Sequence, residues 1–371
     1  MRETENLIQA AIRSSTFPGA VLAVSLKGKV VYHKAFGQAD IFAGTAMTTQ
    51  TFFDLASLTK SLATTLAVMR LVQAGRLGLD QPIVEILPVL DGSGKQKITT
   101  RHLLAHTSGL PAWRPWFIRL RHYPPAERSE KLRRLLIAEP LQAQPGKITV
   151  YSDLGFMLLS WIIEEISAQR LDHFVNAEVY DPLGIEDIFY LDRWSVSVPA
   201  DQFAATQLCP WRQRLLKGQV DDDNTWAMGG IGGQAGLFGT AIEVGVLAET
   251  LRLTAAGVAI SDLFTTRTVS RFFERQSSGR ALGFDVPTRP DSSTGQFFAD
   301  NSVGHLGHTG TSFWIDRDKA LVVVLLTNRV HPFRFSTGIL PFRPRLHDAI
   351  VRELGLTLTT DYTRFQNSKT D

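Results

Sequence analysis

The feature that most constrains this chain is a short apolar run, Phe52-Phe53, that passes almost directly into a long helical pattern. After Ser57, apolar residues recur with a period close to 3.6 residues as far as Val72, and Gly75 supplies a stop. The pattern predicts the end of a strand that turns straight into a half-buried helix. Ser57 and Lys60 are three positions apart in the first turn, so their side chains share one face of that helix.

This spacing brings a hydroxyl and an amine within reach of each other. A serine hydroxyl is a weak nucleophile until a neighbouring base takes its proton, and a lysine can assist if its amine is kept partly neutral. The free N–H groups of a helix N-terminus also favour developing negative charge. A capped amphipathic helix with an exposed lysine explains the same four residues, so the motif needs partners from elsewhere in the chain.

Length and charge limit the classes of protein to which this chain can belong. A chain of 371 residues can form two modest domains, or one large core with an insertion. The net charge of +3 is scattered apart from an arginine-rich stretch at residues 114–134, which disfavours nucleic-acid binding. No apolar run approaches the ~20 residues needed to span a bilayer. The N-terminus lacks an apolar secretory segment, so we expect a cytoplasmic protein if the chain is full length, and a periplasmic one if a leader was removed.

Few side chains are arranged as metal ligands. The single cysteine, Cys209, excludes an internal disulfide and is expected to be a buried free thiol. His102 and His106 are spaced i, i+4 and could bind a metal, but without a third ligand nearby, structural histidines are the better interpretation. The glycine-dense residues 229–236 lack the Gly-Lys-Ser/Thr of a phosphate loop and indicate close backbone packing beside a site. We expect no metal and no cofactor.

Strand patterns stand at both ends of the chain, and helical patterns fill its middle. This order predicts an α+β fold, an α/β sandwich in which N- and C-terminal segments form one antiparallel sheet flanked by helices, with an inserted, mainly helical domain. The expected strands include a hairpin at residues 20–36 and C-terminal strands at 281–286, 304–307, 312–316 and 321–327. The expected boundaries are 1–75 plus 280–371 for the sheet domain and 76–279 for the helical domain, with the active site in the cleft between them.

Three separated motifs now line up: Ser57-Leu58-Thr59-Lys60, Tyr151-Ser152-Asp153 and His305-Leu306-Gly307. Their order and residue types resemble the penicillin-recognising serine hydrolases, a β-lactamase/transpeptidase-like fold. The closest branch holds class C β-lactamases, D-alanyl-D-alanine carboxypeptidases and family VIII carboxylesterases. The resemblance covers about residues 15–355 and includes the pieces 106–111, 236–240, 309–316 and 327–332.

The resemblance implies a role for each matching residue. Ser57 would be the acylated nucleophile and Lys60 its proton partner, while Tyr151 would serve as general base and then as acid to the leaving group. His305 would take the place of the usual lysine on the sheet edge. The backbone N–H groups of Ser57 and His308 would form the oxyanion hole, in which each donor typically contributes ~3 kcal/mol.

The histidine motif has two possible registers. His308-Thr309-Gly310 also spells His-x-Gly and restores the threonine that is usual in the family. We prefer His305, because Gly307 and the residues that follow it then match the family's turn and next strand. At least one of the two histidines would then only pack against the sheet.

Asp153 departs from the asparagine that the resemblance leads us to expect. An amide can donate a hydrogen bond to a substrate carbonyl, whereas a carboxylate cannot. A carboxylate beside Lys60 would also raise the pKa of the ammonium and keep it charged. Our hypothesis is that Tyr151 then carries the base role, with its phenolate stabilised by Lys60.

The strand motif, His305-Leu306-Gly307, also departs from the pattern of the family that the chain resembles. A histidine at position 305 is mostly neutral near pH 7, and Leu306 removes a hydroxyl from the same strand. Both changes argue against tight recognition of a substrate carboxylate and favour uncharged esters or small amides. Four aromatic residues could line an apolar acyl pocket or could equally pack in the core: Trp113, Trp116, Phe117 and Trp226.

The expected function is that of a serine hydrolase that cleaves small ester, amide or peptide substrates through a Ser57 acyl-enzyme. The alternatives are a β-lactamase or D-alanyl-D-alanine carboxypeptidase, and a non-catalytic relative that binds a ligand. The intact set of Ser57, Lys60 and Tyr151 argues against the last of these. The sequence leaves open the physiological substrate, hydrolysis versus acyl transfer, and the oligomeric state.

Overall fold

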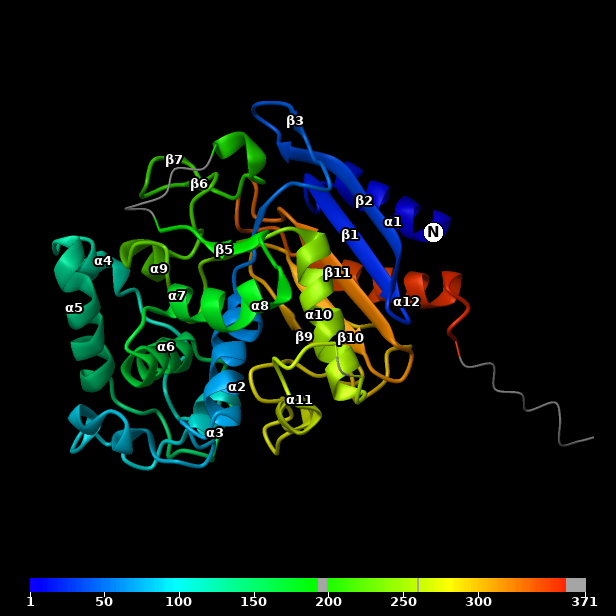
Figure 1. Ribbon diagram of the computed structural model, residues 1–371. Helices are drawn as coiled ribbons and strands as arrows, with labels where there is room; N and C mark the ends of the chain where they lie inside the picture. Colours follow the sequence, from blue (N-terminus) through cyan, green and yellow to red (C-terminus); the bar gives the residue numbers. More distant parts are fainter. Residues whose placement is uncertain (193–198, 259, 358–371) are drawn as a thin grey trace, which may run out of the picture.

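The computed structural model describes residues 1–192, 199–258 and 260–357. Its largest element is a six-stranded antiparallel sheet in the order β3-β2-β1-β11-β10-β9, built from both ends of the chain as the sequence predicted (Figure 1). In the central pairing, Ala23 of β1 lies opposite Val324 of β11. The strands are β1 (Gly19–Leu26), β2 (Lys29–Asp40), β3 (Thr45–Ala46), β9 (Val303–Leu306), β10 (Ser312–Asp316) and β11 (Leu321–Thr327).

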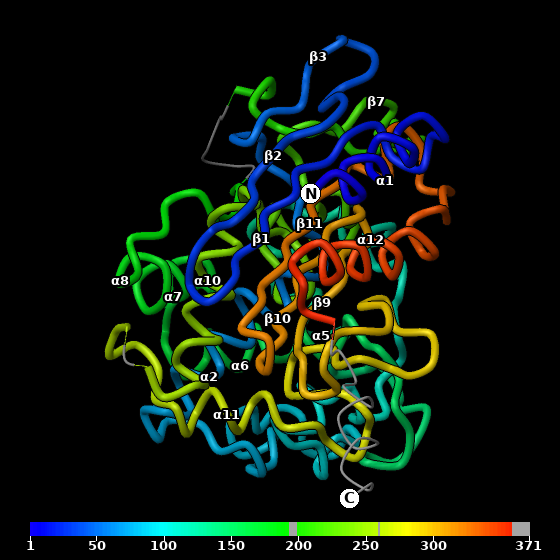
Figure 2. The backbone as a smooth tube through the Cα atoms, turned by 90° about the vertical axis from the view of Figure 1, so that its right-hand side faces the viewer, coloured from blue at the N-terminus to red at the C-terminus, as the bar shows by residue number. Residues whose placement is uncertain are grey.

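Helices cover both faces of this sheet. α1 (Arg2–Arg13) and α12 (Ile339–Glu353) lie on one face, and α10 (Ala241–Ala255) lies on the other (Figure 2). Successive side chains of a strand point to opposite faces, and the seven residues of β11 are all buried. Its residues therefore alternate between two cores: Leu321, Val323 and Leu325 pack with α1 and α12, and Val322, Val324 and Leu326 pack with α10.

The middle of the chain is mainly helical and lies beside the sheet (Figure 1). Its helices are α2 (Leu66–Gln73), α3 (Thr100–Leu104), α4 (Phe117–Leu120), α5 (Pro125–Ala138), α6 (Asp153–Ser167), α7 (Leu171–Val175), α8 (Asp181–Leu183), α9 (Asp223–Ala227) and α11 (Thr266–Phe273). Two small sheets accompany them: β4 (Phe53–Asp54) with β8 (Leu237–Gly239) and β5 (Ile188–Tyr190), and β6 (Leu208–Cys209) with β7 (Arg214–Leu215). No helix in the described ranges is long and apolar enough to cross a membrane.

The helix after Ser57 is more deeply buried than the sequence predicted. Its first turns, Lys60–Thr65, are π-helical, and every residue from Lys60 to Thr65 is buried. The polar residues on the expected exposed face bond to loop carbonyls instead: Ser61 Oγ donates to Gly283 (2.6 Å) and Thr64 Oγ1 to Gly233 (2.7 Å). The half-buried helix that we expected is therefore a core helix, whose polar side is covered by loops.

Two other segments differ from the sequence expectation. Residues 281–286 form bends with a single bridge between Asp285 and Gly304, because Gly283 adopts a φ of +76° that interrupts an extended strand. α10 lies inside the range expected for the helical domain, yet it packs on the sheet. Cys209 is a buried free thiol, as predicted.

Candidate active site

Ser57 lies at a sharp turn between β4 and the central helix. Ala56 adopts a φ of +48°, a left-handed conformation that is uncommon for a residue other than glycine. The buried carboxyl of Asp54 stabilises this turn, because it accepts hydrogen bonds from the backbone N–H groups of Ala56 (2.9 Å) and Asp221 (2.6 Å). The turn leaves Ser57 half-buried just before the helix.

Lys60 reaches Ser57 from the first turn of the helix. Its Nζ donates to the Oγ of Ser57 (3.2 Å), the Oδ1 of Asp153 (2.6 Å) and the carbonyl oxygen of Gln234 (3.0 Å). These bonds match the three protons of an ammonium group. Burial alone would lower the pKa of Lys60, but its interactions with Asp153 and Tyr151 together outweigh burial, and the pKa is raised. Lys60 is therefore charged in the resting site.

The segment Tyr151–Asp153 is positioned by the start of α6 and by His106. Ser152 is the N-cap of α6, and its hydroxyl also donates to the carbonyl of Pro111 (2.6 Å). The Nδ1 of His106 accepts a hydrogen bond from the N–H of Ser152 (2.9 Å), and the His106 ring lies 4.5 Å from the Tyr151 ring. Burial lowers the pKa of His106 well below its ordinary value, so the ring stays neutral and Nδ1 can accept this bond.

Tyr151 faces both members of the first motif. Its phenol interacts with the side chains of Ser57 and Lys60. The Lys60 Nζ lies 4.8 Å from the centroid of the phenol ring, and the Arg280 guanidinium lies 5.1 Å from it. Burial raises the pKa of Tyr151, Lys60 opposes that rise, and Asp153 adds to it, so the pKa is raised overall. The phenol is therefore protonated at rest, and a phenolate forms only when the Tyr151–Lys60 pair loses a proton.

His305 and His308 occupy different places. His305 is on β9, the edge strand of the sheet; its side chain is buried, and its ring lies 6.0 Å from the Tyr151 ring. Its Nδ1 is 2.9 Å from the carbonyl oxygen of Leu306, and burial lowers its pKa to about 4, so the ring is neutral. His308 lies in the turn after β9. The structure thus puts His305 at the sheet edge, where the resemblance expects the strand residue.

Two backbone N–H groups beside the nucleophile are unused by the protein. Within the described ranges, the N–H groups of Ser57 and His308 donate to no protein acceptor, whereas the N–H of Gly307 donates to Thr311 (2.7 Å). Arg329 also donates to the carbonyl of His308 and fixes the turn. This arrangement leaves both expected oxyanion donors for a substrate oxygen.

Two cavities meet at Ser57, Tyr151 and His308. The smaller, about 290 Å³, contains Asp153, Gln234 and the acidic residues 221–223. The larger, about 500 Å³, lies between β9 and α12 and contains three arginines, Arg280, Arg329 and Arg343. A substrate carbonyl at Ser57 would therefore have one substituent in each cavity.

Only one of the four aromatic residues considered for an acyl pocket lines this cleft. Trp113 borders the smaller cavity and is 41% exposed. Trp116 is buried in the main core, Phe117 packs against Trp211, and Trp226 packs edge-on against the same ring. Core packing accounts for these three.

Sequence reasoning missed several residues that touch the site. His106 was taken as structural, and nothing in the sequence showed that its Nδ1 would hold the Tyr151 segment. Arg280, over the Tyr151 ring, comes from a loop without a motif. Gln234 lies in the glycine-dense stretch, where close backbone packing beside a site was expected, and its carbonyl does accept from Lys60.

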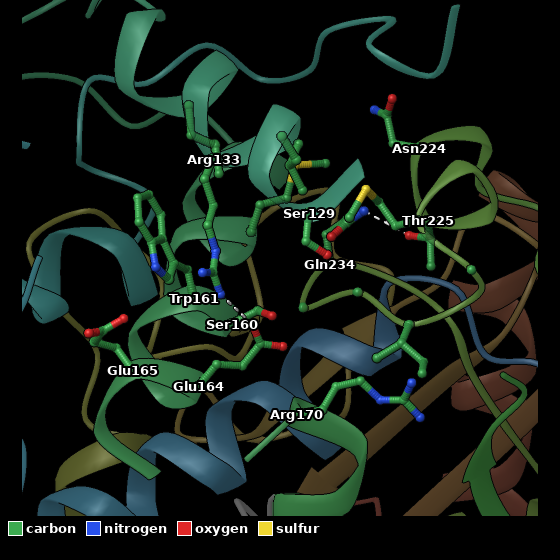
Figure 3. A pocket seen from close by; sticks show the side chains of 18 of the residues that line it. Ser129, Arg133, Ser160, Trp161, Glu164, Glu165, Arg170, Asn224, Thr225 and Gln234 are labelled. Atoms are coloured by element: carbon green, nitrogen blue, oxygen red, sulfur yellow. Dashed lines mark hydrogen bonds and ion pairs between the residues drawn. The ribbon is translucent and has the colours of Figure 1, made fainter. Parts of the chain in front are cut away.

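A third cavity of about 620 Å³ lies behind this glycine-dense loop, between α5 and α6 (Figure 3). Arg133 and Glu164 form an ion pair across it (3.1 Å), and Arg133 stacks on Trp161 (Figure 3). Gln234 borders both this cavity and the smaller cavity at Ser57, but Ser57 does not line it. In the part of the chain that the structure describes, no group of three His, Cys, Asp or Glu side chains could hold a metal ion.

Two comparisons of this sequence with known proteins give matches over most of the chain. The sequence model of a family described as Beta-lactamase matches residues 4–340. A relative from Salmonella agona (strain SL483), named "Putative D-alanyl-D-alanine carboxypeptidase", is 30% identical, and the match covers 88% of this chain and 84% of that protein.

Solved structures share the fold. EstCE1, described as a hydrolase with promiscuous acyltransferase activity, superposes with a TM-score of 0.74 at 24% identity, covering 94% of this chain and 97% of that one. A structure of SurE with D-Leu gives a TM-score of 0.71 at 23% identity, covering 96% and 76%. At 23% and 24% sequence identity, the similarity to these two structures supports the fold of this chain alone.

Proposed function

Because this chain belongs to the β-lactamase family, we propose that it is a serine hydrolase that cleaves ester or amide substrates through an acyl-enzyme on Ser57. The observation that carries the proposal is the convergence of three distant segments. Lys60 donates to Ser57 Oγ at 3.2 Å, the Tyr151 phenol interacts with both side chains, and His308 borders the same cleft. A non-catalytic scaffold would have no chemical reason to assemble this set.

The reaction follows from these positions. Ser57 Oγ attacks the substrate carbonyl carbon and gives its proton to the Tyr151–Lys60 pair. The N–H groups of Ser57 and His308 then bind the negatively charged oxygen of the tetrahedral intermediate. As the intermediate collapses, the bond to the leaving group breaks and the same pair returns the proton to it. Water or another acceptor then attacks the acyl carbon and gives its proton to the pair. The bond to Ser57 Oγ breaks, and the pair returns that proton to Oγ.

The pair has to lose one proton before it can accept the proton of Ser57. Both members have raised pKa values, so the resting site holds a phenol and an ammonium. Because the groups interact, the proton that is lost belongs to the pair rather than to either residue. We therefore expect kcat/KM to rise as the pH increases above neutral.

A second candidate is a D-alanyl-D-alanine carboxypeptidase or β-lactamase activity. It is favoured by the 30% identical Salmonella relative and by the cationic cavity between β9 and α12. A chromogenic β-lactam, a D-alanyl-D-alanine peptide and a short-chain nitrophenyl ester, assayed side by side, would rank these activities.

Labelling with a fluorophosphonate probe tests the proposal directly. We expect the wild-type protein to be labelled and Ser57→Ala to remain unlabelled, because the probe reacts with an activated serine. Ser129→Ala is a matched control, since Ser129 is an exposed serine on α5. Equal labelling of Ser57→Ala and wild type would show that the nucleophile is elsewhere.

A further inference from the structure

The third cavity, between α5 and α6, is not used by the proposed reaction. Its volume of about 620 Å³ lies within the ~300–1,000 Å³ of typical ligand sites. Its charged side chains largely balance, because Arg133 pairs with Glu164 (3.1 Å) and Arg170 pairs with Asp192 (2.7 Å). Among the described residues that line it, the remaining charged one, Glu165, is exposed to solvent. A charged ligand would lose its hydration here without gaining a free counter-ion.

Apolar side chains form most of the walls of this cavity. They belong to the main hydrophobic core or pack against it, so their positions are fixed by the fold. Burial of apolar surface against such walls is favourable, so the cavity suits a ligand with an apolar body. The side chains line the cavity that Figure 3 shows and are those of Leu132, Leu136, Met157, Trp161, Met228 and Ile231.

The glycine-dense loop supplies hydrogen-bond donors. The Tyr190 hydroxyl donates to the carbonyl of Gly232 (3.1 Å). The Thr64 hydroxyl donates in the same way to Gly233 (2.7 Å), and neither hydroxyl belongs to a residue that lines the cavity. The peptide bonds after these carbonyls are trans, so the N–H groups of Gly233 and Gln234 point in the opposite direction. In the described part of the chain neither N–H donates to a protein acceptor, so both are available to a ligand oxygen.

Gln234 connects this cavity to the nucleophile. It borders both the third cavity and the smaller cavity at Ser57. Its side-chain amide donates to Thr225 (2.7 Å) and Asp222 (3.3 Å), and its backbone carbonyl accepts from Lys60 Nζ (3.0 Å). A ligand held by the N–H of Gln234 therefore acts on the residue that also holds the ammonium group of Lys60.

We propose that the third cavity is a second binding site, for an uncharged molecule with an apolar body and a carbonyl oxygen, such as a small amide. The carbonyl accepts from the N–H groups of Gly233 and Gln234, and the apolar body lies between α5 and α6. Because Ser57 does not line the cavity, the molecule is an effector rather than a substrate. Its binding is independent of the proposed function, whereas its effect on kcat, through Gln234 and Lys60, rests on that function.

A matched pair of small molecules tests the chemistry of the site. N-benzylacetamide is uncharged, and 4-(acetamidomethyl)benzoate adds one carboxylate to the same skeleton. In isothermal titration calorimetry of the full chain we expect the amide to bind saturably and the benzoate to bind about tenfold more weakly or not at all. Absence of saturable amide binding would overturn the site, and equal affinity for the benzoate would overturn its preference for an uncharged ligand.

Two alanines of α5 locate the bound amide. Ala126 lines the cavity and Ala138 does not, although both are exposed. Ala126→Trp should weaken binding of N-benzylacetamide about tenfold or more, because the indole takes up the volume of the ligand. Ala138→Trp is the matched control and should leave the affinity unchanged. Equal affinity in Ala126→Trp and wild type would place the amide elsewhere and overturn the site.

Hydrogen–deuterium exchange in the wild type tests the donors directly and requires no variant, in case Ala126→Trp fails to fold. We expect N-benzylacetamide to slow exchange in a peptide that spans residues 229–236, because two N–H groups of this loop gain an acceptor. 4-(Acetamidomethyl)benzoate should leave the exchange unchanged. Unchanged exchange in the presence of saturating amide would overturn the assignment of these donors.

Steady-state kinetics with a nitrophenyl ester tests the connection to Ser57. Saturating N-benzylacetamide should change kcat about twofold or more without competing with the ester, and Ala126→Trp should lose this response. Binding with an unchanged kcat would overturn the effect through Gln234, and competition with the ester would place the amide at Ser57 instead. If Ser57→Ala hydrolyses the ester as fast as the wild type, the acyl-enzyme proposal fails, while the binding results still decide whether the second site exists.

Discussion

At the scale of single residues, the charge of Asp153 controls the proton balance of the site. Its carboxylate lies 2.6 Å from Lys60 Nζ, raises the pKa of the ammonium and adds to the raised pKa of Tyr151. An amide at this position would bond to the same lysine without holding its proton. The resting site is therefore protonated more fully than it would be with asparagine at this position.

The pH dependence of Asp153→Asn tests this balance. Removing a negative charge lowers the pKa of the Tyr151–Lys60 pair, so the active form is reached at lower pH. We expect the acidic limb of the kcat/KM profile to move down by about one pH unit or more. The profile of Asp172→Asn, a carboxylate paired with Arg170 away from the cleft, should not move. An acidic limb that stays in place in Asp153→Asn would show that the limb belongs to another group.

The variant Tyr151→Phe tests the role of Tyr151 in the Tyr151–Lys60 pair. The substitution keeps the ring against His106 but removes the phenol hydroxyl that interacts with Ser57 and Lys60. Loss of a general acid–base group lowers the rate typically ~10²- to 10⁴-fold, and we expect kcat/KM to fall in that range. Near-normal turnover of Tyr151→Phe would exclude it from the base role.

At the scale of elements, the site depends on loops that are fixed by single side chains. His106 links the end of α3 to the start of α6, because its Nδ1 accepts from Ser152 and its ring stacks on Tyr151. We expect His106→Ala to lower both the melting temperature and kcat, since an orphaned buried N–H costs about 1–3 kcal/mol. His122→Ala, at an exposed histidine, should change neither. An unchanged kcat in folded His106→Ala would mean that the segment Tyr151–Asp153 keeps its position without the hydrogen bond to His106.

Gly283 fixes a second loop against the central helix. At its φ of +76°, a Cβ would lie 1.9 Å from Oγ1 of the buried Thr65, so an added methyl group clashes as well as straining the backbone. Gly279 has nearly the same φ, +78°, with nothing within 4 Å of its Cβ position. We expect Gly279→Ala to cost about 1–2 kcal/mol from backbone strain alone, and Gly283→Ala about 3 kcal/mol or more. Chemical denaturation measures both, and equal losses would contradict the clash.

Some of these elements could be predicted from the sequence, and others could not. The hairpin, β11 and the helix after Ser57 follow from local periodicity, which requires no knowledge of distant contacts. The burial of Ser61 and Thr64 and the interrupted segment at residues 281–286 depend on which loops cover them. The role of His106 depends on tertiary placement in the same way. The motif residues could be identified because their types and order match the pattern of the family. The supporting residues follow no local sequence pattern.

At the scale of the whole molecule, one buried carboxyl links stability to pH. Asp54 joins β4 to the loop at Asp221, and burial raises its pKa from 3.8 to about 7. Between these values the folded protein holds a proton that the unfolded chain has released. The free energy of unfolding contributed by this group therefore falls as pH rises from about 4 to about 7.

Asp54→Asn should remove this dependence. An amide stays neutral at every pH and its oxygen can still accept a backbone hydrogen bond. We expect the wild type to lose roughly 3 kcal/mol of stability from this group between pH 4 and 7, and the variant to lose less, as measured by urea denaturation at each pH. Asp91→Asn, at an exposed position, serves as the control. Parallel curves for wild type and Asp54→Asn would contradict the raised pKa.

The central claim is that three distant segments converge to make Ser57 a nucleophile that carries the acyl group. Intact-mass spectrometry after exposure to a panel of esters, D-alanyl peptides and β-lactams tests it most directly. The account predicts the mass of one acyl group per chain, mapped by proteolysis to a peptide that contains Ser57 and absent from Ser57→Ala. An acyl group on another residue, or hydrolysis that continues unchanged in Ser57→Ala, would contradict it.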